Sequence, residues 1–213
     1  MTLGDALGLS DLQERFLTRT LQAILGGLIV YGLFTAQWGM ALNGMFALAV
    51  TLLPALLRRE YGYAMDSGLV LWITVALFLN ALGLMGLYSR YQWYDEITHT
   101  VSATIIAGLG YAAFRAFEVH SDEIDVPSAF RSVFVVVFVL AAAVVWELLE
   151  FASELLAEHV GGIAPLTVYG IDDIVTDMIF NAVGAVLVAL WGGGYVGGVV
   201  SFFRERLRAR DDG

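Results

Sequence analysis

Long apolar stretches separated by short polar joins dominate this chain of 213 residues. A helix that crosses a bilayer needs roughly 20 mostly apolar residues, and six stretches are close to this length or longer. They cover Thr20–Gln37, Met40–Leu57, Leu69–Tyr88, Ile97–Phe117, Phe130–Phe151 and Ile174–Phe203. Strict alternation of apolar and polar positions is absent, which disfavours a membrane β-barrel. The pattern predicts an all-α, polytopic membrane helix bundle with about six transmembrane helices, formed by residues 19–203.

The two ends of the chain differ from this central part. Residues 1–18 are predicted to be either an amphipathic helix lying at the membrane surface or a flexible segment. The first span is not a cleavable signal peptide, because acidic residues precede it and its apolar run is too long. Residues 204–213 are rich in Arg and are predicted to be a tail that contacts lipid headgroups.

The distribution of Arg sets the expected orientation. Lys is absent, and all 11 basic residues are Arg. If both termini are cytoplasmic, ten Arg fall on the inner side of the six spans and only Arg90 falls on the outer side. Loops rich in positive charge stay in the cytoplasm, so we predict a multi-pass protein of the cell membrane with both termini cytoplasmic.

Composition narrows the classes of partner. The chain is 59% hydrophobic and only 15% charged, so membrane lipids are its expected surroundings. A net charge of −10 excludes a nucleic-acid partner, which would need a basic face. The chain has no Cys and therefore no thiolate metal site. A homo-oligomer is compatible with these features.

Polar residues recur at helical spacing near the outer ends of the last three spans. Offsets of three and four residues place each set on one face of its helix. The sets are Asp95, His99 and Ser102 in the fourth span, Glu147, Glu150 and Glu154 in the fifth, and Asp173, Asp177 and Asn181 in the sixth. Together they predict a polar cup that opens towards the outer surface. Asn43 and Asn80, in the second and third spans, are expected to form hydrogen bonds between helices.

The outer side carries nine carboxylates but only one Arg and two His under this topology. Buried carboxylates are costly unless they are paired, protonated or bound to a cation. A divalent metal ion is the first interpretation, and shared protons are the second. The simplest alternative is that acids at helix ends merely face water. The predicted metal ligands are Asp95, His99, Glu147, Glu150, Asp173 and Asp177.

These positions also carry a family resemblance over residues 90–190. Asp95-x-x-x-His99, Glu147-Leu148-Leu149-Glu150 and Asp173-x-x-x-Asp177-Met178 resemble motifs of the YjdF-like family of small multi-pass prokaryotic membrane proteins. The order of an Asp/His helix, a Glu helix and an Asp–Asn–Gly helix is also similar, more loosely, to the VanZ-like proteins. The resemblance implies a site and a topology, but no particular reaction. It does not extend to the first two spans.

Three functions are compatible with the pattern. The first is a metal-dependent enzyme that acts on a lipid or lipid-linked substrate, with Glu150 as the catalytic general base. The second is a protein that binds or transports a cation or a proton. The third is a non-catalytic bundle with an acidic outer surface. The enzyme is favoured over transport because the inner halves of the spans carry almost no ionisable residues.

Overall fold

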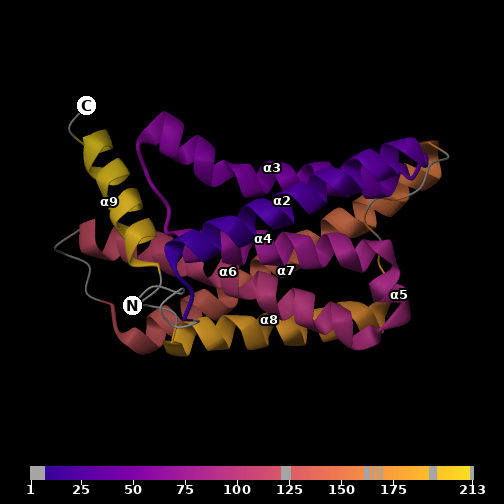
Figure 1. Cartoon of the computed structure of the whole chain (residues 1–213). Coiled ribbons are helices and arrows are strands. Elements are labelled where there is room, and N and C mark those ends of the chain that lie inside the picture. Colours follow the sequence, from indigo (N-terminus) through magenta and orange to yellow (C-terminus); the bar gives the residue numbers. More distant parts are fainter. Residues whose placement is uncertain are drawn as a thin grey trace.

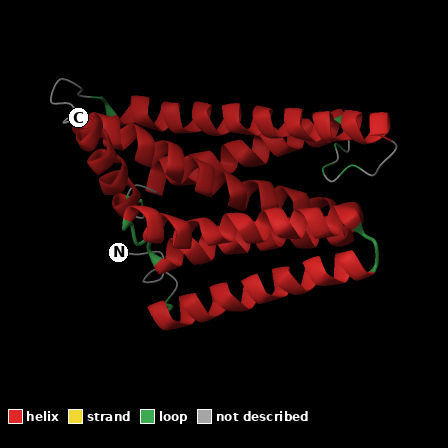
Figure 2. Ribbon diagram, turned by 90° about the horizontal axis from the view of Figure 1, so that it is seen from above, coloured by secondary structure: helices red, strands yellow, loops and turns green. Residues whose placement is uncertain are grey.

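The computed structural model describes residues 8–120, 126–160, 164, 166, 168, 170–191 and 196–211. Within these residues the chain is helical and contains no strand (Figure 2). Six helical segments are long and apolar enough to cross a membrane. The prediction of a polytopic all-α bundle with six spans is therefore confirmed.

The six spans are built from successive helices. Their bounds are α2 Asp11–Phe34, α3 Trp38–Tyr61, α4 Ser67–Leu82, α6 Gln92–His120, α7 Ser128–Val160 and α8 Ile171–Trp191. The third span continues beyond α4 through a π-helical turn, η1 Gly83–Leu87, and a short helix, α5 Tyr88–Arg90. A further helix, α9 Gly197–Asp211, follows the sixth span.

The spans form two groups of three. Helices α2, α3 and α4 pack on one another, as do α6, α7 and α8, and α4 joins the two groups by packing against α6 (Figure 1). The closest packing joins α6 and α8 through small side chains, because Ala103, Ala107 and Ala185 are almost fully buried there. A Cβ atom on Gly184 would collide with the backbone of α6 at Thr100. Small residues let helices approach closely in a membrane, and this approach brings α8 alongside α6.

The third span contains the main irregularity of the bundle. In η1, Gly86 has a φ of +110°, which lies in a region that favours glycine. A side chain at Gly83 would overlap the ring of Tyr88, so glycine is needed there as well. Single π-helical turns inside a helix are often found at functional sites, and this one lies next to α5, at the end of the bundle opposite α9 (Figure 1).

Helix α2 begins at Asp11, earlier than the predicted Thr20. Ser10 caps it and forms a capping box with Gln13. Glu14 is buried and accepts a hydrogen bond from Ser67, so this part of the predicted segment 1–18 belongs to the bundle. Residues 1–7 of that segment lie outside the described part of the chain.

The predicted sixth span, Ile174–Phe203, is divided between two helices. Helix α8 ends at Trp191 and α9 begins at Gly197. The intervening sequence is rich in glycine, which disfavours a continuous helix. Val196 and Val199 bury their side chains with Ala112 of α6, so α9 packs across that end of the bundle (Figure 1). The predicted tail 204–213 is the second half of α9, apart from residues 212–213, which are not described.

Candidate metal centre

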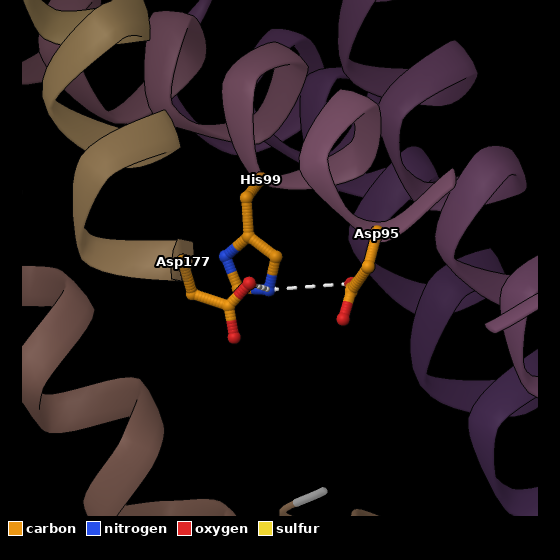
Figure 3. A group of neighbouring side chains, drawn as sticks. All are labelled: Asp95, His99 and Asp177. Carbon is orange, nitrogen blue, oxygen red and sulfur yellow. Dashed lines mark ion pairs between the residues drawn. The ribbon is translucent and has the colours of Figure 1, made fainter. Parts of the chain in front are cut away.

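Asp95, His99 and Asp177 converge near the N-terminal ends of α6 and α8. These three residues are called the acid–histidine cluster. Figure 3 shows the His99 ring on α6 with Asp95 of the same helix on one side and Asp177 of α8 on the other. His99 Nε2 lies 3.4 Å from Asp95 Oδ1 and 3.5 Å from Asp177 Oδ1. One ligand atom from each residue falls within 4.8 Å of the other two. The spacing of four residues places Asp95 and His99 next to each other on one face of α6. The close packing of α8 on α6 brings Asp177 to this pair.

These distances are long for direct hydrogen bonds, and they are compatible with three ligands of one cation as well as with ion pairs of a protonated imidazole. An N–H···O hydrogen bond has a donor–acceptor distance of about 2.7–3.2 Å. Two ligands of a tetrahedral metal ion are about 3.4 Å apart when each lies about 2.1 Å from the metal. An imidazole nitrogen with carboxylate oxygens is a donor set for Zn²⁺, Fe²⁺ or Mn²⁺. The three residues therefore fit a divalent cation, with coordination positions left for water or substrate.

Burial makes the charge balance of the cluster important. The Asp177 side chain is only 4% exposed, whereas those of Asp95 and His99 are 17% and 15% exposed. One buried and one partly buried carboxylate next to one imidazole leave a net negative charge even when the imidazole is protonated. A divalent cation would neutralise the pair of carboxylates and offset the cost of their burial.

Asn181 orients the imidazole from one turn further along α8. Its side-chain amide lies 3.1 Å from His99 Nδ1, and the residue is buried. An Asn amide can present either its nitrogen or its oxygen to the ring. In the structure the amide nitrogen Nδ2 faces Nδ1, and with Nδ2 as donor the neutral ring carries its proton on Nε2, towards the two carboxylates. Turning the amide so that its oxygen accepts from Nδ1–H frees the lone pair of Nε2 for a metal. Partners of this kind fix the tautomer of metal-binding histidines.

A chain of hydrogen bonds supports Asp95 from the third span. Asn80 donates to the hydroxyl of Tyr88 (3.0 Å), which donates to Thr98 Oγ1 (3.3 Å). Thr98 in turn donates to Asp95, at 2.8 Å from its backbone oxygen and 3.3 Å from Oδ1. The turn η1 allows this chain, because it places Tyr88 against Gly83 and towards α6. Asn80 of α4 thus bonds to Tyr88 of α5, so the expected bond between helices joins two segments of the same span rather than two different spans.

Two more of the predicted ligands lie at the small cavity beside the cluster, here called the polar cavity. It has a volume of about 20 Å³, enough for one water molecule or one ion. Its lining includes Asp95, His99 and Asp177 together with Glu150 and Asp173. Glu150 Oε1 accepts a hydrogen bond of 2.9 Å from the indole N–H of Trp146. Glu150 and Asp173 therefore face the cluster but do not belong to the set of three ligand atoms.

Glu147 differs from the other predicted ligands. It is only 8% exposed, and neither of its carboxylate oxygens has a hydrogen-bond partner in the described part of the chain. It does not line the polar cavity. A buried carboxylate without a partner is costly. Glu147 therefore resembles the cluster in one respect, because its carboxylate is also buried without a neutralising partner among the described residues.

Sequence reasoning missed three residues of this region: Tyr88, Thr98 and Trp146. Tyr88 stands at the end of the predicted apolar span Leu69–Tyr88, and no spacing rule connects it with Asp95. Gly83 and Gly86 were the available signals, because paired glycines in an apolar span mark a break in regular helix. Trp146 stands four residues before Glu150, which is the spacing of side-chain partners on a helix.

The fold and the site define an all-α, polytopic membrane protein with a cluster of carboxylate and histidine side chains at one end of its bundle. Residues 16–198 match the family described as predicted membrane protein DUF2238, and the chain belongs to this family. The match is consistent with the resemblance to a YjdF-like membrane family and also includes the first two spans. The comparisons with curated proteins and with solved structures give no match.

Proposed function

We propose that this protein is a metal-dependent enzyme that hydrolyses a lipid or lipid-linked substrate at the outer side of the membrane. The observation that carries the proposal is the convergence of one ligand atom each from Asp95, His99 and Asp177 within 4.8 Å. Three protein ligands with open coordination positions are typical of catalytic rather than structural metal sites. Asp173 and Glu147 are proposed as further ligands or as carboxylates that raise the affinity for the cation.

The position of the cluster supports a substrate that comes from the membrane. His99 stands seven residues into α6 and Asp177 six residues into α8, or roughly 10 Å along each helix axis at 1.5 Å per residue. The cluster thus lies just inside the outer end of two membrane-spanning helices. A substrate that reaches the cluster therefore has to bring its polar group slightly below the membrane surface, which favours a substrate already held in the bilayer.

The roles of the side chains follow from their chemistry. A divalent cation at this site would polarise the phosphoryl or acyl oxygen of the substrate. Glu150 is the proposed general base, because its carboxylate lines the polar cavity and Trp146 holds it by a hydrogen bond. In the hydrolysis of a phosphoester, Glu150 takes a proton from the attacking water, whose oxygen bonds to phosphorus. The bond from phosphorus to the lipid oxygen breaks, and that oxygen takes up the proton.

Cation or proton transport is the alternative. Transport requires a polar route from the cluster to the inner side of the membrane. Most of the side chains that line the space next to His99 are apolar, which supports an enzyme rather than a transporter.

The metal content of the purified protein tests the proposal. We expect about one equivalent of a divalent cation per chain in the wild type after dialysis against Mn²⁺ or Zn²⁺ and desalting. Asp177→Asn should lose that cation, because it removes a charged ligand from a buried site. Glu150→Gln should keep the cation and lose lipid phosphatase or esterase activity by roughly 10²–10⁴-fold, the usual contribution of a general base.

Asp172→Asn is the matched control, because it removes the same charge from an exposed residue of the same helix. Equal metal content in wild type, Asp172→Asn and Asp177→Asn would refute the metal centre. Metal binding without hydrolysis of any lipid ester would leave a cation-binding protein and refute the enzyme.

A further inference from the structure

A second cavity adjoins the polar cavity on the side of the bundle interior. It has a volume of about 260 Å³ and is called here the apolar cavity. Its walls come mainly from Ala76 and Leu77 of α4, Ile106 of α6, and Val139 and Ala143 of α7. Ile106 follows His99 by seven residues on α6, so the apolar cavity extends roughly 10 Å deeper into the membrane than the cluster. Small side chains create this space, because Ala76 and Ala143 contribute only a methyl group each.

The two cavities are neighbours and share part of their lining. Asn80, His99 and Trp146 line both of them. At this shared end the apolar cavity also carries uncharged hydrogen-bonding groups, namely Thr98, Ser102 and Asn181. The combined space is therefore polar and next to the cluster at one end, and it is lined by hydrocarbon at the other end.

The apolar cavity also reaches the lipid-facing surface of the protein. Phe46 of α3 lines it, and Phe46 is 55% exposed. Helix α3 packs on α2 and α4 rather than along α7, which forms another wall of the cavity. A hydrocarbon chain could thus enter sideways from the bilayer. An apolar cavity of about 150 Å³ already holds a benzene ring, so one of 260 Å³ has room for a longer segment of chain.

We propose that the apolar cavity binds the hydrocarbon chain of a lipid phosphate whose phosphate group lies at the end shared with the polar cavity. The inference rests on the proposed function in one respect, because the cation must supply the positive charge that attracts the phosphate. The polar cavity is large enough for the ion alone, so the phosphate lies beside it, at the end of the apolar cavity that Asn80, His99 and Trp146 share with the polar cavity. Divalent cations held by carboxylates commonly bind substrate phosphate in this way. A soluble phosphate ester would leave the apolar part empty.

Photo-crosslinking in lipid nanodiscs tests this assignment. The probe is dodecyl phosphate with a diazirine at the far end of the chain, added with Mn²⁺, and the labelled peptides are identified by mass spectrometry. We expect labelling of α4 and α7 around Ala76 and Ala143, with competition by unlabelled dodecyl phosphate. Ala143→Phe fills the cavity and should reduce the labelling at least tenfold. Ala141→Phe is the matched control, because Ala141 is an exposed residue of the same helix.

The metal content of each variant is measured in the same samples as an independent test of the fold and of the cluster. Ala143→Phe with unchanged metal content and lost labelling supports the chain-binding cavity. Labelling that is equal in wild type, Ala143→Phe and Ala141→Phe overturns it, whatever the metal content. Cavity labelling that persists without any cation, and also in Asp177→Asn, supports the cavity but refutes the role of the cation in holding the phosphate; the metal content of the same samples decides the metal centre separately.

Discussion

At the scale of residues, His99 links most of the features of the site. One of its ring nitrogens faces two carboxylates and the other faces Asn181. The sequence pattern predicted Asp95 and His99 on one helical face, because a spacing of four residues fixes that relation locally. The pattern also placed Asn181 on the face of Asp177. The contact of Asn181 with the ring depends on how two helices dock, which a spacing within one helix cannot specify.

The contact between Asn181 and His99 leads to a prediction about metal affinity. Asn181→Leu removes the partner of Nδ1 and frees the ring to rotate or to change tautomer, so we expect the affinity for Mn²⁺ or Zn²⁺ to fall 10–100-fold. Asn181→Asp keeps an acceptor for Nδ1–H and should retain tight binding. Competition titration with a chelating dye measures both variants. Equal affinities for Asn181→Leu and the wild type would show that this contact does not orient a ligand.

At the scale of elements, the π-helical turn decides how the third span supports the site. Its glycines allow the Tyr88 ring to lie across Gly83, from where the hydroxyl reaches Thr98. The hydropathy pattern predicted one span over Leu69–Tyr88 but not the break in it. An apolar stretch indicates which residues lie within the bilayer. Whether the backbone hydrogen bonds there follow the α-helical or the π-helical pattern depends on how side chains pack with neighbouring helices.

Gly83→Ala tests this element. The added methyl group would overlap the Tyr88 ring, so the turn must shift, and we expect a loss of stability of about 1–3 kcal/mol. The displaced Tyr88 should also weaken metal binding through Thr98 and Asp95. Gly26→Ala is the control, because open space surrounds Gly26 within α2 and the change should be neutral or stabilising. Thermal melting in detergent compares the two, and an undisturbed Gly83→Ala protein would show that the turn is dispensable.

At the scale of the whole molecule, the proposed reaction at the outer side of the membrane depends on the orientation of the bundle. Helix α9 and the beginning of α2 lie at one end, and the cluster lies at the other end (Figure 1). The Arg residues of α9 are at the first end, together with Arg58 and Arg59 at the end of α3. This arrangement agrees with the predicted cytoplasmic termini, and the orientation itself stays a prediction.

Cysteine labelling tests the orientation on a clean background, because the chain has no Cys. Asp172→Cys is exposed at the end of the bundle that carries the cluster and should react with a membrane-impermeant maleimide in intact cells. Glu60→Cys is exposed at the opposite end and should react only after permeabilisation. The reverse pattern would place the cluster in the cytoplasm and exclude a substrate from the outer leaflet.

The sequence by itself determined the number of spans and the helical faces that carry the acids. These properties depend on hydropathy and on the period of a single helix, both of which are local. Only the tertiary structure decided which side chains meet. It brought Asp177 to His99, left Glu147 outside the set of three ligand atoms, placed Tyr88 behind Asp95 and opened the apolar cavity beside His99. The physical reason is that helix docking is set by the packing of small residues from distant parts of the chain, such as Gly184 against Thr100 and Ala103.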